Sequence, residues 1–153
     1  KDAATFMGDQ WPSDAFPDQP APVEVWRWPV MGGQQRISIV DGELQDSAAH
    51  ARRGGGPAVD MEAREGQELV LLVTPSAWRQ AWDGAEGGYM LDYTFEGTRG
   101  VWKVRYCHMD GPGSMQAGHT GNTTGPHLHM LLWLNGELVR PEEQPEFQAL
   151  LEA

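Results

Sequence analysis

The chain has 153 residues, 40% of them hydrophobic, which suits one ordinary domain with a proper core. Its formal net charge of -11 excludes the basic face that nucleic-acid binding and adhesion to an anionic membrane require. No run approaches the roughly 18 apolar residues of a membrane span. The 19 glycines and 11 prolines indicate many turns and hence a β-rich architecture.

The first half of the chain predicts short strands between irregular segments. Residues 1–22 lack periodicity, so we expect an irregular N-terminal arm or linker there, which contacts the domain through Trp11 and Phe16. Strands are expected at residues 23–30, 35–44 and 58–61. An Asp41-Gly42 turn belongs to the second of these segments, and residues 45–57 are expected to form a loop.

The second half predicts one buried strand, two hairpins and a helix. Residues 67–74 are an apolar run typical of a buried strand, which Pro75 stops. Residues 76–85 fit either a short helix or a loop. The expected hairpins join residues 89–96 to 101–109 through Gly97-Thr98-Arg99-Gly100, and 127–134 to 137–139 through Asn135-Gly136. A short helix is expected from Pro141 to Leu151.

Together these elements predict an all-β domain over residues 23–153. We expect a two-layered antiparallel sheet with one short C-terminal helix. A groove should hold the functional site, with walls formed by the loops at 45–57, 76–88 and 110–124.

Two closely spaced histidines are the first candidates for a functional site. His127 and His129 stand two residues apart at the start of an apolar strand, so their side chains project from one face. Paired imidazoles on one face favour a transition-metal site, and zinc is the usual ion. The alternative is a pair of surface or core histidines. Gly125 and Pro126 favour the metal site because they stiffen the start of the strand.

Two further residues suit the same site. His108 ends a predicted strand, where a purely structural histidine is the alternative. Asp60 is flanked by apolar residues, and a buried carboxylate needs a partner. A metal would supply that partner, and so would Arg52 or Arg53. Cys107 is expected to point into the core, because adjacent residues of a strand face opposite ways.

These motifs resemble those of the lysostaphin-like zinc endopeptidases, which cut peptide bonds in bacterial peptidoglycan. The family's run Gly-x-Thr-Gly-x-Ser/Thr-Thr-Gly-Pro-His-Leu-His is matched closely by residues 118–129. Its Tyr-x-His-Leu stretch is matched by Tyr106-Cys107-His108-Met109, and Val59-Asp60-Met61 is similar to its aspartate strand. The resemblance covers roughly residues 24–142 and implies the lysostaphin-type peptidase fold.

The resemblance also implies a role for each site residue. Asp60 and His129 correspond to zinc ligands. His108 and His127 correspond to the catalytic pair that polarises the attacking water and stabilises the tetrahedral intermediate. This division is chemically sound, because zinc lowers the pKa of bound water toward about 7 and a nearby imidazole can then take its proton.

One ligand of the family's site is missing from its usual position. The family's first zinc ligand is a histidine four residues before the aspartate, where this chain has Gly56. His50 would replace it if the glycine run at 54–56 let its loop fold back toward Asp60. His119 is a second candidate for the third ligand. The alternative for His50 is a solvated loop histidine.

Two functions follow. The first is a zinc-dependent endopeptidase that hydrolyses peptide bonds of peptidoglycan. The second is a catalytically impaired pseudo-peptidase that binds peptidoglycan or a partner protein as a regulator or scaffold. His108, His127, His129 and Asp60 favour the first function, and Gly56 favours the second. We expect the bacterial cell envelope or the extracellular space as the location, with a phage-borne domain equally compatible, and an envelope or virion protein as a further partner.

Overall fold

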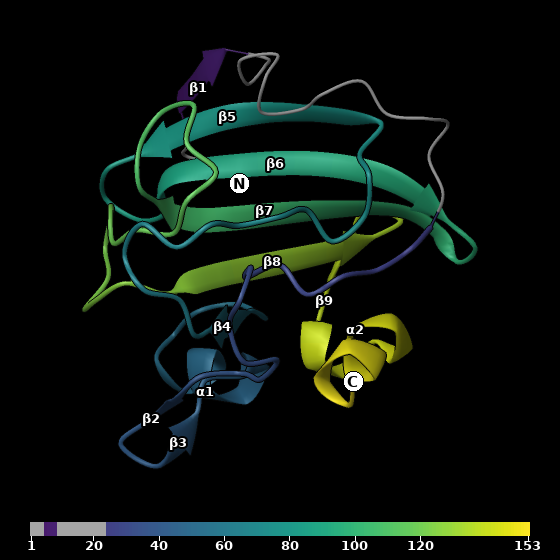
Figure 1. The fold of residues 1–153 in the computed structure, drawn as a ribbon, viewed down its shortest axis with the longest axis horizontal. Helices are drawn as coiled ribbons and strands as arrows, with labels where there is room; N and C mark the ends of the chain where they lie inside the picture. The colour runs from purple at the N-terminus through teal and green to yellow at the C-terminus, as the bar shows by residue number, and fades with distance from the viewer. Residues whose placement is uncertain (1–4, 9–23) are drawn as a thin grey trace.

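The computed structural model describes the backbone of residues 5–8 and all of residues 24–153. Its main sheet is antiparallel throughout, in the order β1-β5-β6-β7-β8-β4, and β9 also pairs with β8 (Figure 1). The strands are β1 (Thr5–Gly8), β4 (Val59–Met61), β5 (Ala77–Asp83), β6 (Gly88–Gly97), β7 (Gly100–Met109), β8 (Leu128–Leu134) and β9 (Glu137–Val139). The predicted all-β class and antiparallel sheet are confirmed.

Five smaller elements complete the described chain. They are β2 (Ile39–Val40), β3 (Glu43–Leu44), α1 (Ser47–Arg52), η1 (Pro141–Glu143) and α2 (Pro145–Leu151). The expected C-terminal helix is thus present as a 3-10 turn followed by a short α-helix. Among residues 24–153 no helix is long and apolar enough to cross a membrane. The predicted arm contacts of Trp11 and Phe16 lie outside the described residues.

Both predicted hairpins form, because their turn residues suit the backbone. Gly97 pairs with Gly100, which leaves Thr98 and Arg99 as the turn between β6 and β7. The β8–β9 turn at Asn135-Gly136 has positive φ at both positions, 51° and 84°. Asn and Gly are the residues that tolerate this two-residue turn. Asp41-Gly42 makes the same kind of turn, with φ of 52° and 80°, between β2 and β3.

Two predicted strands are wrong, because their segments lie over the sheet instead of within it. Residues 24–30 and 67–74 form only isolated bridges, such as Val30 to Leu69. They bind each other through Val70 N–H to Pro29 O at 2.9 Å. The two segments run over one face of the main sheet as a second layer (Figure 1), and their apolar side chains belong to the hydrophobic core. An apolar run predicts burial, but periodicity alone does not decide whether the buried segment joins a ladder.

Two other segments are more regular than expected. Residues 76–85, predicted as a helix or loop, contain β5, which pairs with β6 from Ala77–Thr94 to Asp83–Gly88. Residues 45–57, predicted as a loop, contain helix α1. Asp46 caps this helix, since its side chain accepts a hydrogen bond from Ala49 N–H at 3.0 Å. The helix matters because it carries His50.

A pair of buried tyrosine hydroxyls joins the second layer to the sheet. The Tyr93 hydroxyl donates to the Tyr106 hydroxyl at 2.8 Å, and Tyr106 donates to Val70 O at 2.7 Å. Leu72 N–H completes the chain by donating to Tyr93 at 2.8 Å. Burial raises the pKa of both phenols well above the ordinary value. Both phenols are therefore neutral at neutral pH and can donate hydrogen bonds.

Replacing Tyr106 by Phe should destabilise the fold without changing its shape. The variant leaves the Tyr93 hydroxyl and Val70 O buried without their present partner, which costs about 1–3 kcal/mol. Urea denaturation measures this loss. Tyr89→Phe, at a partly buried position on the neighbouring strand, is the control and should lose much less. Equal losses in the two variants would contradict the linking role of Tyr106.

Candidate metal centre

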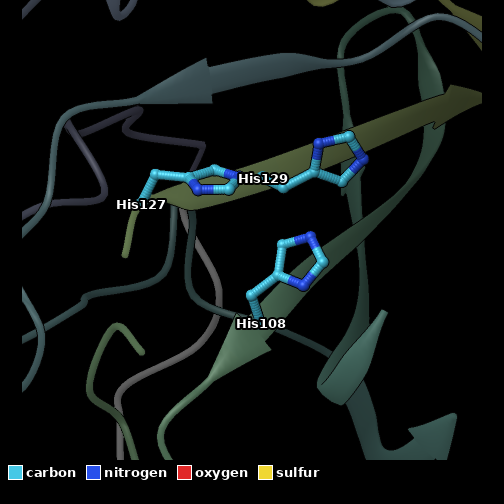
Figure 2. A group of neighbouring side chains, drawn as sticks. All are labelled: His108, His127 and His129. Atoms are coloured by element: carbon cyan, nitrogen blue, oxygen red, sulfur yellow. The ribbon is translucent and has the colours of Figure 1, made fainter. Parts of the chain in front are cut away.

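Four histidines and one aspartate meet on the face of the sheet opposite the core. His50 comes from α1, Asp60 from β4, and His108 from the end of β7. His127 directly precedes β8, and His129 lies within it. Figure 2 shows the rings of His108, His127 and His129. All five line one groove, which also receives residues from the predicted wall segments 45–57, 76–88 and 110–124.

The Asp60 carboxylate is the centre of this group. One of its oxygens, Oδ1, is 2.8 Å from His129 Nδ1, 3.2 Å from His50 Nε2 and 3.5 Å from His127 Nε2. Strand pairing makes the first contact, because Asp60 and His129 stand directly opposite each other in the β4–β8 ladder. Burial opposes ionisation of Asp60, but the hydrogen bonds from His129 and His50 hold its pKa well below the ordinary value.

The arginines proposed as alternative partners of Asp60 lie elsewhere. Arg52 binds the Glu43 carboxylate at 2.6 Å, and Arg53 donates to Gln45 Oε1 at 2.9 Å. The partners of the Asp60 carboxylate are therefore histidines and not arginines.

Helix α1 places His50 beside Asp60. The His50 Nδ1–H donates to the backbone oxygen of Asp46 at 2.8 Å, which orients the ring with Nε2 facing Asp60. The helix itself is held by Ser47, whose hydroxyl donates to Glu142 Oε1 at 2.8 Å. His50, Asp60 and His129 each offer one ligand atom, and these three atoms lie within 4.8 Å of one another.

His108 enters the groove because its backbone is unusual. Its φ of 60° is rare for a residue other than glycine, and it turns the ring to the face that carries His129. Thr120 secures this position, since its carbonyl oxygen accepts from His108 Nδ1–H at 2.7 Å and its hydroxyl donates to Met109 O at 2.6 Å. His127 is held in the same manner, with Nδ1–H donating to Gly125 O at 2.8 Å.

The same backbone turn overturns the expected direction of Cys107. Cys107 is buried, but it stands opposite His129 in the β7–β8 ladder and so lies on the groove side of the sheet. It packs there in a small cluster with Ala81 and Met90, separate from the main core. The rule that adjacent strand residues face opposite ways fails here, because His108 does not have strand geometry.

Burial keeps two of these rings uncharged. It lowers the pKa of His108 to about 4, although the hydrogen bond to Thr120 works against the shift. It also lowers the pKa of His129. For His50 burial acts in the same direction, but the hydrogen bonds to Asp60 and Asp46 outweigh it and raise the pKa. Neutral imidazole is the form that binds a metal or accepts a proton.

Two other positions considered in the sequence, the candidate ligand His119 and the glycine at the family's usual ligand position, contribute no side chain to the cluster. His119 is exposed, and its Nδ1 lies 3.2 Å from the Glu65 carboxylate, so the structure does not support it as the third ligand. Gly56 borders the groove by its backbone. A Cβ at that position would meet only the Leu138 methyl group, at 3.4 Å.

The sequence did not single out three supporting residues. Asp46 caps α1 and orients His50, and an aspartate directly before Ser-Ala-Ala-His-Ala-Arg is a helix-start signal that could have been recognised. Thr120 lies within the run 118–129, but nothing in the sequence predicts its contact with His108. Glu142 is 95 residues from Ser47, and no local pattern indicates such a contact.

Comparisons with known proteins find similar structures for this chain but no similar family model or curated sequence. No protein-family model matches the chain, and no curated protein sequence matches it. A Pseudomonas aeruginosa protein assigned to peptidase M23 aligns with TM-score 0.48 and 19% identity over 86% of this chain and 53% of that chain. A zinc containing peptidase from Vibrio cholerae aligns with TM-score 0.38 and 23% identity over 78% of this chain and 37% of that chain. This chain thus spans about half of the first protein and just over a third of the second.

Acid should destabilise the metal-free protein mainly through His108. As the pH falls from 6.5 toward 4, His108 binds a proton in the unfolded chain but stays neutral in the folded chain. The free energy of unfolding therefore decreases as the pH is lowered. A pKa lowered from 6.5 to about 4 corresponds to about 3 kcal/mol. His129 acts in the same direction, whereas the raised pKa of His50 gives stability that is lost above its ordinary value.

Urea denaturation between pH 6.5 and 4, with chelator present, measures how the free energy of unfolding changes with pH. His108→Gln should flatten the pH dependence, because the titrating group is gone, and His119→Gln is the control that should leave it unchanged. A slope that persists in His108→Gln would show that another group is responsible.

Proposed function

We propose that this chain is a zinc-dependent endopeptidase that hydrolyses peptide bonds of bacterial peptidoglycan. The observation that carries the proposal is the meeting of His50, Asp60 and His129 in one groove, with His108 and His127 beside them. Two histidines and one carboxylate are a ligand set found in catalytic zinc sites, where a fourth position stays open.

One distance within the cluster is close to that of two zinc ligands, whereas His129 Nδ1 and Asp60 Oδ1, at 2.8 Å, are at hydrogen-bond distance and would have to separate slightly around an ion. Two ligands bound tetrahedrally at about 2.0–2.1 Å are roughly 3.4 Å apart. His50 Nε2 and Asp60 Oδ1 are 3.2 Å apart. The backbone oxygen of Asp46 supports the His50 ring through Nδ1, as is usual for metal-binding histidines. His50, Asp60 and His129 would therefore hold the ion.

The remaining histidines are placed to handle protons. The chemistry that zinc supplies when bound is polarisation of a carbonyl and a lowered pKa for water. His108 and His127 have Nδ1 committed to the carbonyls of Thr120 and Gly125, so Nε2 of each ring is left for the groove. A neutral ring accepts the proton of the attacking water, and a ring that has gained it donates to the oxyanion or the leaving amine.

Peptidoglycan is proposed as the substrate on the strength of the sequence motif. Residues 118–129 resemble the run typical of endopeptidases that act on this polymer. The net charge of -11 gives no reason to expect a nucleic-acid substrate. The open groove, bordered by residues of the segments 45–57, 76–88 and 110–124, offers room for an extended peptide. This function places the protein in the bacterial envelope or outside the cell, and a phage-borne origin fits equally.

A second function rests on Gly56. A pseudo-peptidase would keep the groove and bind peptidoglycan, or an envelope or virion protein, without cleaving it. The glycine at the usual ligand position favours this function, whereas the position of His50 next to Asp60 favours the enzyme. The two functions differ in metal content, which can be measured directly.

Elemental analysis of the purified protein, before and after chelation, should find close to one zinc ion per chain. His50→Ala should weaken zinc binding by about 100-fold or more, because it removes one of three protein ligands. His119→Ala is the matched control, since its exposed ring lies outside the cluster and should bind as the original chain does. Unchanged zinc affinity in His50→Ala would exclude His50 as a ligand, and absence of zinc binding would favour the pseudo-peptidase.

Loss of either proton-handling ring should separate catalysis from metal binding. His108→Ala and His127→Ala should each lower the rate of peptidoglycan hydrolysis by about 10²–10⁴-fold, the usual contribution of general acid–base catalysis. Both variants should retain the tightly bound zinc, because neither ring belongs to the three ligands. New amino groups released from purified peptidoglycan report the rate. Full activity in both variants would contradict the assigned roles.

A further inference from the structure

Acidic side chains outnumber arginines along the groove. Among residues 24–153, the arginines that border it stand at positions 53, 64 and 105. The acidic residues that border it are Asp41, Glu43, Asp60, Glu62, Asp83 and Glu86. An anionic group of a ligand is repelled by most of this lining, because like charges close together raise the free energy of the complex. A carboxylate is therefore best accommodated beside an arginine that has no acidic partner of its own.

Two of the three arginines have such a partner within the protein. Arg53 donates to Gln45 Oε1 at 2.9 Å and lies 3.4 Å from Glu43 Oε1. Arg105 binds both oxygens of the buried Asp92 carboxylate, at 2.7 Å and 2.8 Å. The charge of each of these guanidinium groups is thus balanced by a carboxylate of the chain itself.

Arg64 differs from the other two. Its side chain is exposed, and no carboxylate of residues 24–153 forms an ion pair with it. The acidic residues next to it in the sequence have other partners. Glu62 is bound by Arg36 at 2.5 Å. Glu65 lies 3.2 Å from His119 Nδ1. The guanidinium of Arg64 therefore keeps its charge and its hydrogen-bond donors for a ligand.

The backbone of Arg64 is held firmly at the edge of the groove. Its N–H donates to Gln67 Oε1 at 2.9 Å, and its carbonyl oxygen accepts from Gln67 N–H at 3.0 Å. The Gln67 amide also donates to Met31 O at 3.1 Å, and Gly66 N–H donates to Ala117 O at 2.7 Å. An anchored backbone limits the positions that the side chain can take, so less conformational freedom is lost when a ligand binds.

Arg64 is close enough to the candidate metal centre to contact the same ligand. It follows Asp60 by four residues, and a segment of that length spans at most about 14 Å even when fully extended. An extended peptide in the groove advances by about 3.3 Å per residue. A group of the peptide within about four residues of the bond to be cut is therefore within reach of Arg64.

We propose that Arg64 binds a free carboxylate of the peptidoglycan stem peptide and so selects acidic stem peptides over amidated ones. Stem peptides carry such a group on the glutamate that is linked through its γ-carboxyl group, and another at the C-terminus. A guanidinium matches a carboxylate with two parallel hydrogen bonds. Arg64 thereby sets the register of the peptide in the groove and takes no part in bond cleavage. The inference rests on the proposed substrate, but it does not depend on hydrolysis.

Calorimetric titration of the full chain with synthetic stem peptides tests this inference. The peptide Ala-γ-Glu-Lys-Ala-Ala is compared with the same peptide amidated at the glutamate and with one amidated at the C-terminus. Chelator is present, so that no peptide is hydrolysed. The unchanged chain should bind the acidic peptide about 3–10-fold more tightly than one of the amides, and that amide identifies the carboxylate. This preference should shrink as the salt concentration rises.

Variants of Arg64 connect the preference to this side chain. Arg64→Gln should bind the acidic and amidated peptides equally. Arg64→Lys should keep a smaller preference, because an ammonium group retains the charge but not the planar pair of donors. Arg140→Gln is the matched control, since it removes the same charge from an exposed arginine that pairs with Glu143 outside the groove, and it should keep the full preference.

The outcomes separate this inference from the proposed function. Equal affinities in the unchanged chain, or a preference that persists in Arg64→Gln, would overturn the role of Arg64 and leave the zinc and hydrolysis experiments unaffected. Binding of none of the peptides would refute the stem peptide as the ligand, and this inference with it. A preference that is lost only in Arg64→Gln, in a chain that does not hydrolyse peptidoglycan with zinc present, would support the inference and exclude the peptidase activity.

Discussion

The groove depends on one buried carboxylate. An ionised aspartate removed from water is stable only if other groups replace the lost hydration, and the effective penalty is several kcal/mol. Around Asp60 the rings of His129 in β8 and His50 in α1 provide this replacement through hydrogen bonds, and His127, from the segment before β8, lies 3.5 Å away. The elements around the groove can therefore be understood as the means of bringing these rings to one oxygen atom.

Local chemistry decided which parts of the fold could be predicted. Asn135-Gly136 and Asp41-Gly42 were recognisable because their positive φ angles suit few other residues. Residues 67–74 and 76–85 were misjudged because their structure is set by partners distant in sequence. The first segment is bound by Pro29 and Tyr93, and the second is paired along its length with β6. Nothing within either segment reveals those partners.

The residues of the site were also predictable only where their positions depend on nearby sequence. His129 and Asp60 were predictable because each stands in a short strand with apolar neighbours, and pairing of β4 with β8 then places them face to face. The family motif indicated a role for His108, but the direction of its side chain was not predictable from strand geometry, because it depends on a positive φ held by Thr120. His50 could be named only as one of two candidates, since its position depends on a helix that the glycine-rich sequence concealed.

The position of His50 changes how the site is stabilised. A ligand at position 56 would lie four residues from Asp60 in the sequence, so the start of β4 would hold both. His50 instead belongs to a helix of six residues, too short to be stable alone. That helix depends on its Asp46 cap and on the bonds of Ser47 to Glu142, which precedes the C-terminal helix. If the groove binds a metal as proposed, its affinity should therefore depend on the packing of the C-terminal segment. A site with the family's ligand spacing would not need that coupling.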